Sequence, residues 1–398
     1  MFHKIRNKSK DFKEPCYIDS KKNEYEFLKS GLVQIFKKFN SCSEELITEN
    51  VRIYIDGTPR YDLHGLLKND IPDRFEDIKT WCENIFEGHN FLILINKAEK
   101  WNDLLAQKFS SEFHDINSEI DKTPVHLEAT YFIGNSKYTP FGAHIDDISD
   151  AFHYNLGPDR REMILWDRET YIKSRGSNAP LQNPENLIEY GNRFPIDCMQ
   201  KFFLPARNYY HVGVNNSFNI SFALAFIKYD IKEYMQQSIL MKAKELGIEY
   251  KKVENYIEEH IYKGELKAEG LGYDLGRFSI GEAITENVMN LISKGGFREA
   301  PFANDNIDDI DEKIKIVRKV PFQAYTLSKG NQIFVFVRGT KIQLPKKSEF
   351  LLLINKINSN IELKFGDLIK ESELPKEIIW KLISLFYKYN LIELKRNE

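Results

Sequence analysis

The chain has 398 residues, of which 42% are hydrophobic and 29% are charged, and its formal net charge is -3. This length is enough for two or three domains with cores of their own, and the composition excludes a disordered protein. The small net charge gives the whole chain no nucleic-acid footprint. No apolar run approaches the roughly 18 residues that a membrane-spanning helix needs, so we expect no membrane partner.

The cysteines and the first residues point to one compartment. The four cysteines are scattered without any Cys-x-x-Cys spacing, which indicates neither a disulfide framework nor a zinc ribbon. Residues 1–8 are basic and polar, and they lack the apolar segment of a secretory signal. Together these features predict a cytoplasmic protein.

The first part of the chain mixes helical and strand patterns. Apolar residues recur at helical spacing over Lys22–Asn40, Phe75–Phe86 and Trp101–Phe113. Between them, Phe91–Ile95 is a short continuous apolar run that predicts a buried strand. Residues 1–124 are therefore expected to form an α/β preamble that wraps the segment that follows.

From Val125 onward, short strand patterns follow one another quickly. They are enough for a two-sheet jelly roll. A loop from Ser174 to Asn192, rich in Gly, Asn and Pro, interrupts them, and we expect it to line a substrate groove together with Tyr209 and Tyr210. The expected strands are Leu127–Ile133, Ala143–Ile145, Ala151–Asn155, Met163–Trp166, Lys201–Leu204, Tyr209–Val214 and Asn219–Phe226.

After Tyr229 the pattern changes to helices. They are expected at Lys232–Leu246, Lys251–Tyr262 and Ile280–Ser293, and an acidic link over residues 295–311 marks a boundary.

The last segment, residues 312–398, has the element order of a winged helix. It consists of a hairpin over Gln332–Ile342, three helices and a short strand. Lysines are abundant in this segment, but they are spread over all its elements and no Arg-rich recognition helix is present. We therefore do not expect nucleic acid as a partner. The helices are expected at Ser348–Ile357, Phe365–Ile369 and Pro375–Tyr389, and the strand at Leu391–Glu393.

The most informative motif is His144-Ile145-Asp146, followed much later by His211. Residues two apart on a strand point to the same face, so His144 and Asp146 would converge on one point, to which a second strand can bring His211. Two imidazoles and one carboxylate leave open positions on a metal, an arrangement typical of non-heme Fe(II) oxygenases. We expect His153, on the next strand, to line the same pocket without binding the metal.

Four local features of residues 127–229 resemble the JmjC/cupin-type 2-oxoglutarate-dependent oxygenases. Two departures are tyrosines in place of a family tryptophan before His211 and a longer turn before Arg161. The features are the lead-in Thr139-Pro140 to the His-x-Asp motif, the turn Tyr154-Asn155-Leu156-Gly157-Pro158, the run Phe202–Pro205 leading to Tyr209-Tyr210-His211, and the strand Asn219–Phe226.

The resemblance implies an α+β architecture closest to the bacterial ribosomal oxygenases. Its core would be a double-stranded β-helix, the jelly roll of cupins, over residues 125–230, after the preamble at 1–124. A helical dimerisation region at 231–311 and a winged-helix-like domain at 312–398 would follow, so a homodimer is implied.

The resemblance also implies the cofactors Fe(II) and 2-oxoglutarate, with O2 as cosubstrate. In this family a basic residue after the Gly turn holds the distal carboxylate of 2-oxoglutarate. That position matches Arg161, with Arg160 as the alternative because the turn is longer. A planar guanidinium suits a carboxylate, but the run Arg160-Arg161-Glu162 is equally readable as a solvated strand face.

Other polar residues are candidates for the same carboxylate. Thr139 or Tyr131 would add a hydroxyl donor. Asn219 and Ser221 are weaker candidates, since both fit ordinary positions on a half-buried strand.

The expected function is hydroxylation of a C-H bond in an amino-acid side group of a protein or peptide, with release of succinate and CO2. One alternative is a tailoring hydroxylase of a ribosomally made precursor peptide, whose leader the winged helix would recognise. Others are a metal cupin without oxygen chemistry, favoured if Arg161 faces solvent, and a winged-helix regulatory protein.

Overall fold

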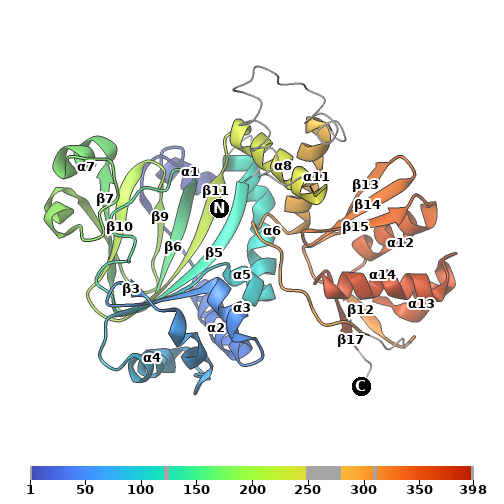
Figure 1. Cartoon of the computed structure of the whole chain (residues 1–398), viewed down its shortest axis with the longest axis horizontal. Helices are drawn as coiled ribbons and strands as arrows, with labels where there is room; N and C mark the ends of the chain where they lie inside the picture. The colour runs from blue at the N-terminus through green and yellow to red at the C-terminus, as the bar shows by residue number, and fades with distance from the viewer. Residues whose placement is uncertain (1, 121–124, 248–278, 308–311, 396–398) are drawn as a thin grey trace, which may run out of the picture. The chain divides into compact units, whose positions relative to one another are not determined.

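The computed structural model describes residues 2–120, 125–247, 279–307 and 312–395 (Figure 1). They divide into two compact units, the first built from Met1–Ile120, Val125–Lys228 and Phe297–Phe302 and the second from most of the remaining chain. The expected helix at Lys251–Tyr262 lies outside the described residues. Within the described ranges, no helix has the length and apolar character to cross a membrane.

The first unit contains two antiparallel sheets that face each other. The smaller sheet has the order β10 (Tyr209–Asn215), β7 (Arg161–Asp167) and β8 (Asn192–Ile196). The larger sheet has the order β1 (Cys16–Ile18), β9 (Lys201–Leu204), β6 (Ser149–Pro158), β11 (Asn219–Lys228), β5 (Val125–Gly134), β4 (Phe91–Ile95), β2 (Val51–Ile55) and β3 (Thr58–Pro59).

The polypeptide moves back and forth between these sheets as in a jelly roll. From β5 in the large sheet it passes to residues 143–144, which bridge to β10 in the small sheet, and then returns to β6. β7 and β8 follow in the small sheet, β9 in the large, β10 in the small and β11 in the large. This alternation defines a two-sheet jelly roll, as expected from the strand patterns.

The rear face of the large sheet is covered by helices. They include α2 (Lys22–Phe39) and α6 (Asp103–Ile120), and Figure 1 shows them beside the sheet. Phe222 of β11 is fully buried there, and its ring contacts the rings of Phe109, Tyr131 and Tyr154. Since side chains alternate along a strand, the neighbours of Phe222 on β11 face the other way, into the jelly roll.

The N-terminal preamble is part of the same sheet. Its strands β1 to β4 extend the large sheet at both edges, and all but β4 are short strands that the sequence patterns did not predict. The other elements before β5 are α1 (Phe2–Lys8), α3 (Glu44–Asn50), η1 (Tyr61–Lys68), η2 (Phe75–Asp77), α4 (Ile78–Phe86) and α5 (Ala98–Trp101).

Three expectations within the jelly roll are corrected. Residues Tyr154–Pro158 are the end of β6 and not a turn, because they continue the pairing with β11 through a bulge. Ala143–Ile145 makes isolated bridges only. The segment 174–192 is less irregular than expected, because it includes the end of α7 (Arg168–Arg175), all of η3 (Glu185–Tyr190) and the start of β8.

The second unit combines helices and two small sheets. α8 (Ile231–Glu245) packs on α11 (Ile280–Ser293), where buried Lys242 pairs with Glu286 at 2.9 Å. One sheet has the order β13-β14-β15 and the other β16-β12-β17. The elements after α11 are β12 (Lys315–Arg318), β13 (Tyr325–Lys329), β14 (Gln332–Val337), β15 (Thr340–Pro345), α12 (Ser348–Ser359), β16 (Glu362–Lys364), α13 (Phe365–Glu371), α14 (Lys376–Lys388) and β17 (Ile392–Lys395).

The acidic link behaves differently from expectation at its start. Residues 297–302 belong to the first unit, where Phe297 is buried and bridges to Leu127 of β5. Phe302 packs edge-on against Trp101 with ring centroids 4.9 Å apart. The aromatic residues of this stretch therefore hold it against the first unit.

The aromatic cluster around Phe222 predicts a stability effect. Phe222→Ala should lower the free energy of unfolding of the first unit by about 3–5 kcal/mol, because it leaves a cavity among three packed rings. The measurement is urea unfolding followed by circular dichroism. Leu104→Ala on α6 is the matched control, since this side chain is half exposed. Equal stability of the two variants would contradict the account.

Candidate metal centre

Two backbone hydrogen bonds bring the two candidate histidines together. The His144 amide donates to the His211 carbonyl at 3.1 Å, and the His211 amide donates to the His144 carbonyl at 2.7 Å. Residues paired in this way lie directly opposite and project to the same face. Asp146, two residues further on, projects to that face too, and its amide donates to the Ala206 carbonyl at 3.2 Å.

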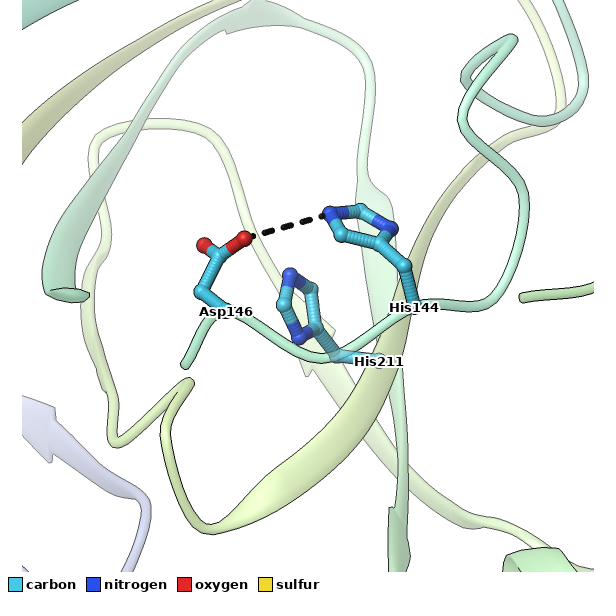
Figure 2. A group of neighbouring side chains, drawn as sticks. All are labelled: His144, Asp146 and His211. Atoms are coloured by element: carbon cyan, nitrogen blue, oxygen red, sulfur yellow. Dashed lines mark ion pairs between the residues drawn. The ribbon is translucent and has the colours of Figure 1, made fainter. Parts of the chain in front are cut away.

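The three side chains point toward one another (Figure 2). One ligand atom from each of His144, Asp146 and His211 lies within 4.8 Å of the others. His144 Nε2 is 3.7 Å from Asp146 Oδ1, and the two imidazole centroids are 4.4 Å apart. At metal-ligand bonds of about 2.0–2.2 Å, three atoms so placed can reach a single ion. The structure thus brings together the residues that the motif predicted.

Backbone carbonyls orient both imidazoles. His144 Nδ1 lies 3.0 Å from the Gly142 carbonyl and His211 Nδ1 lies 3.3 Å from the Tyr209 carbonyl. With Nδ1–H as donor, each ring keeps the Nε2 lone pair for a metal. Burial, and then the charge of His144, lower the pKa of His211 to about 4 against the opposing effect of Asp146. His211 is therefore in its neutral, ligand form at neutral pH.

Polar neighbours hold the carboxylate in place. The Ser149 hydroxyl donates to Asp146 Oδ2 at 3.2 Å, while Oδ1 is the oxygen nearer His144. Buried Asp150 accepts from the Arg207 guanidinium at 2.9 Å, next to the Ala206 carbonyl that holds the Asp146 amide. Such outer contacts orient the ligands of a metal site.

The three side chains border a cavity of about 220 Å³ inside the jelly roll. Alternate residues of the strands from both sheets line it, as the two-residue period of a strand requires. Besides the three candidate ligands they include Thr130, Phe132, Thr139, Ser149, His153, Arg161, Met163, Gly213, Ala223 and Ala225.

Arg161 is the one cationic side chain on this wall. It is 4% exposed, and its guanidinium donates to the hydroxyl of Ser221 across the cavity. Nε has no partner, and no carboxylate among the described residues lies within ion-pair distance. Burial lowers the pKa of Arg161 to about 10, so it is charged at neutral pH. A buried, unpaired charge is costly, which favours an anion as its ligand.

A glycine makes room for this guanidinium. Gly213 on β10 lies diagonally opposite Arg161 in the β10–β7 pair, and a Cβ atom built there would lie 2.4 Å from Arg161 Nη2. Sequence reasoning missed Gly213, although it lies two residues after His211 and therefore on the same strand face. That spacing was the available signal.

His153 lines the cavity from β6, as expected. It is 9% exposed, and its Nδ1 atom is buried without a hydrogen-bond partner. Burial, followed by the charges of Arg161 and His211, holds the pKa of His153 well below its usual range. A neutral imidazole therefore faces the space between the candidate ligands and Arg161.

The structure corrects two of the candidate anchors. Arg160 is exposed at the surface, where its Nε pairs with Asp197 at 2.7 Å, so it is no alternative to Arg161. The Tyr131 hydroxyl donates to the Leu28 carbonyl at 2.7 Å on the rear of the sheet. Strand alternation explains the error, because Thr130 and Phe132 occupy the cavity side of β5.

The remaining polar candidates divide. Thr139 is on the cavity wall, and Ser221 accepts from Arg161. Asn219 is not on the wall: its Nδ2 atom donates to Asn155 Oδ1 at 2.9 Å and to the Asp159 carbonyl at 2.7 Å. It supports the turn that leads to Arg161 and has no direct access to a ligand.

The tyrosines before His211 do not line a groove. Tyr210 is 3% exposed and stacks on Tyr171 with ring centroids 3.7 Å apart, within the core on the outer face of the small sheet. Tyr209 is half-buried against a second cluster. The loop fares better, because Gln182 and Asn183 border a surface hollow.

Comparison with known proteins gives weak structural likenesses and no sequence family. No family model and no curated protein matches this sequence. The structure is similar to the ribosomal oxygenase YcfD from Escherichia coli in complex with cobalt and succinic acid, with 13% identity, a TM-score of 0.45 and coverage of 88% of this protein and 89% of that one.

Two other likenesses are of the same kind. YcfD in complex with cobalt and 2-oxoglutarate matches at 13% identity and a TM-score of 0.42 over 77% of this protein and 78% of that one. The non-heme alpha-ketoglutarate-dependent carbocyclase SnoK from nogalamycin biosynthesis matches at 8% identity and a TM-score of 0.30 over 57% of this protein and 83% of that one. At such scores these likenesses do not decide the reaction, which has to be inferred from the site.

The geometry predicts a metal-binding defect. Asp146→Ala and His211→Ala should each weaken Co(II) or Mn(II) binding by more than the roughly 10–100-fold typical of outer-contact mutations, because each removes a ligand. Calorimetric titration of metal-free protein measures the affinity, and circular dichroism checks the fold. The exposed His89→Ala is the matched control. Unchanged affinity in either variant would remove that residue from the ligand set.

Proposed function

We propose that the protein is an Fe(II)- and 2-oxoglutarate-dependent oxygenase that hydroxylates a C-H bond in an amino-acid side group of a protein or peptide. One observation carries the proposal: two histidines and an aspartate converge at one end of a cavity that also contains a buried, unpaired arginine. This donor set leaves positions open on the metal, as in non-heme Fe(II) oxygenases. A dicarboxylate is the kind of molecule that would join the two ends.

The residues of the cavity fit these cofactors. His144, Asp146 and His211 would hold Fe(II), and Arg161, with Ser221 beside it, would hold the distal carboxylate of 2-oxoglutarate. When bound, iron and 2-oxoglutarate supply the oxidising power: one oxygen atom of O2 enters succinate, with release of CO2, and the other enters the hydroxylated product. The protein supplies orientation and exclusion of water.

The alternatives differ in what they ask of Arg161. A metal cupin without oxygen chemistry is favoured if Arg161 faces solvent, whereas this side chain is buried in the cavity. A regulatory winged-helix protein would need neither the convergent ligands nor the arginine. Tailoring of a ribosomally made precursor peptide uses the same chemistry and differs only in its substrate.

For the second unit we propose a winged-helix fold that contacts the substrate or a partner subunit. The order α12, β16, α13, α14, β17 supports this fold. The pairing of α8 with α11 supports the helical region as a dimer contact, and the protein is proposed to act as a homodimer in the cytoplasm.

The proposal predicts a spectroscopic signal. Anaerobic addition of Fe(II) and then 2-oxoglutarate to metal-free protein should produce the weak visible charge-transfer band of the chelated cosubstrate. His211→Ala should lose this band. Tight metal binding by the wild type without any band would instead favour a cupin that lacks oxygen chemistry.

The anchor predicts a selective loss of 2-oxoglutarate binding. Arg161→Met should cost about 2–5 kcal/mol of binding free energy for 2-oxoglutarate, because the distal carboxylate loses a buried charged partner. Metal affinity should not change. Titration of the charge-transfer band measures both, and the surface variant Arg160→Met is the control. Equal affinity in the two arginine variants would refute the assignment.

Gly213→Ala tests the same anchor without touching it. The added Cβ would displace the guanidinium, and overpacking of about 1–3 kcal/mol corresponds to roughly a tenfold or greater loss of 2-oxoglutarate affinity. Metal binding, measured in the same titration, should be preserved. Retention of full cosubstrate affinity would mean that Arg161 does not need its present position.

A further inference from the structure

A second, larger hollow of the first unit adjoins the metal cavity. Its volume is about 650 Å³, and Thr139 lies on the wall of both. Thr139 precedes His144 by a short segment, so a molecule in the hollow lies beside the metal centre. We call it the amide groove after the side chains that dominate its wall, which are Asn90, Asn135, Gln182, Asn183, Asn215 and Asn216.

The size of the metal cavity implies that most of a substrate lies elsewhere. Pockets that enclose a whole drug-sized ligand have volumes of about 300–1,000 Å³, and the metal cavity has only about 220 Å³. It has room for a small cosubstrate and the reacting group of a substrate. The body of the substrate must then rest outside, and the amide groove is the adjoining space.

The groove carries little free charge. Asp56 and Lys137 are the charged side chains on its wall, and both have partners. Asp56 Oδ2 accepts from His89 Nδ1 at 2.9 Å, and Lys137 pairs with Glu185. A polyanion such as nucleic acid needs unpaired cations along its path. The occupant is therefore expected to be uncharged where it contacts this wall.

Several amide groups on the wall are available for hydrogen bonds. Among the described residues, the side chains of Gln182 and Asn216 are exposed and make no hydrogen bond, and the Oδ1 atom of Asn215 is buried without a partner. Each carboxamide combines an N–H donor with a C=O acceptor. The same pair of groups recurs along an extended polypeptide backbone.

The aromatic content argues against a sugar or a base. Tyr138 is the aromatic residue on the wall, and Lys137 Nζ lies over its ring at 5.3 Å from the centroid. Stacking of bases needs an open aromatic face, and one face of this ring is already occupied. Hydrogen bonding, and not stacking, is what this wall offers.

From these observations we infer that the amide groove binds an extended, uncharged polar segment of the polypeptide whose modified residue reaches the metal cavity. The inference rests on the proposed function, because it takes the metal cavity as the reaction centre. It narrows the substrate to a polypeptide with uncharged residues beside the modified position. Gln182 and Asn216 would hold its backbone.

A library of blocked decapeptides on beads tests the inference. Full-length protein with Mn(II) and 2-oxoglutarate is the labelled probe, and all residue types are included in the library. The sequences on bound beads should be poor in Asp, Glu, Lys and Arg. The best peptide should lose affinity by roughly tenfold in the double variant Gln182→Ala/Asn216→Ala, since two sets of backbone hydrogen bonds are removed.

Asn178→Ala is the matched control, because Asn178 is exposed on the same loop but does not line the groove. Absence of bound beads, charged binding sequences, equal affinity in the double variant, or preferential binding of oligosaccharides on a glycan array would each overturn the inference. Affinities for Mn(II) and 2-oxoglutarate are measured separately. A failure there would count against the metal site and not against the groove.

Discussion

The reciprocal backbone hydrogen bonds between His144 and His211 are the constraint on which the rest of the site depends. They attach an irregular segment to the edge of the small sheet, so that residues 67 positions apart in the sequence face the same point. Because the pairing is antiparallel, Asp146 extends past the end of β10 toward Ala206 and completes the set. A slip of one residue would turn both histidines away from the cavity.

The second feature is an unsatisfied charge held deep in the jelly roll. Arg161 has one neutral partner, Ser221, and the space it occupies exists because residue 213 has no Cβ. A fold maintains such a group at a cost in stability, and perturbed buried charges are typical of functional sites. The cavity therefore has opposite chemistry at its two ends, metal ligands at one and a cation at the other, which suits a small molecule with two anionic groups.

Sequence patterns predicted the parts of this fold that depend on local periodicity. The jelly-roll strands β5, β6, β7, β9, β10 and β11 follow from alternating apolar residues, and the ligand trio follows from a two-residue spacing plus one distant histidine. The short strands β1 to β3 were missed because a few residues show no period, and their pairing is decided by neighbours. Tyr131 and Asn219 were misplaced because strand face and turn packing were not known.

The sequence by itself determined which residue types are available, and the spacing of His144 and Asp146 was enough to predict a shared face. Only the tertiary structure decided between Arg161 and Arg160. These neighbours alternate across one strand boundary, so one is buried opposite Ser221 while the other meets Asp197 in solvent. The amide groove was likewise invisible in the sequence, because its side chains come from four separate segments. Burial and proximity between distant segments are properties of the packed fold.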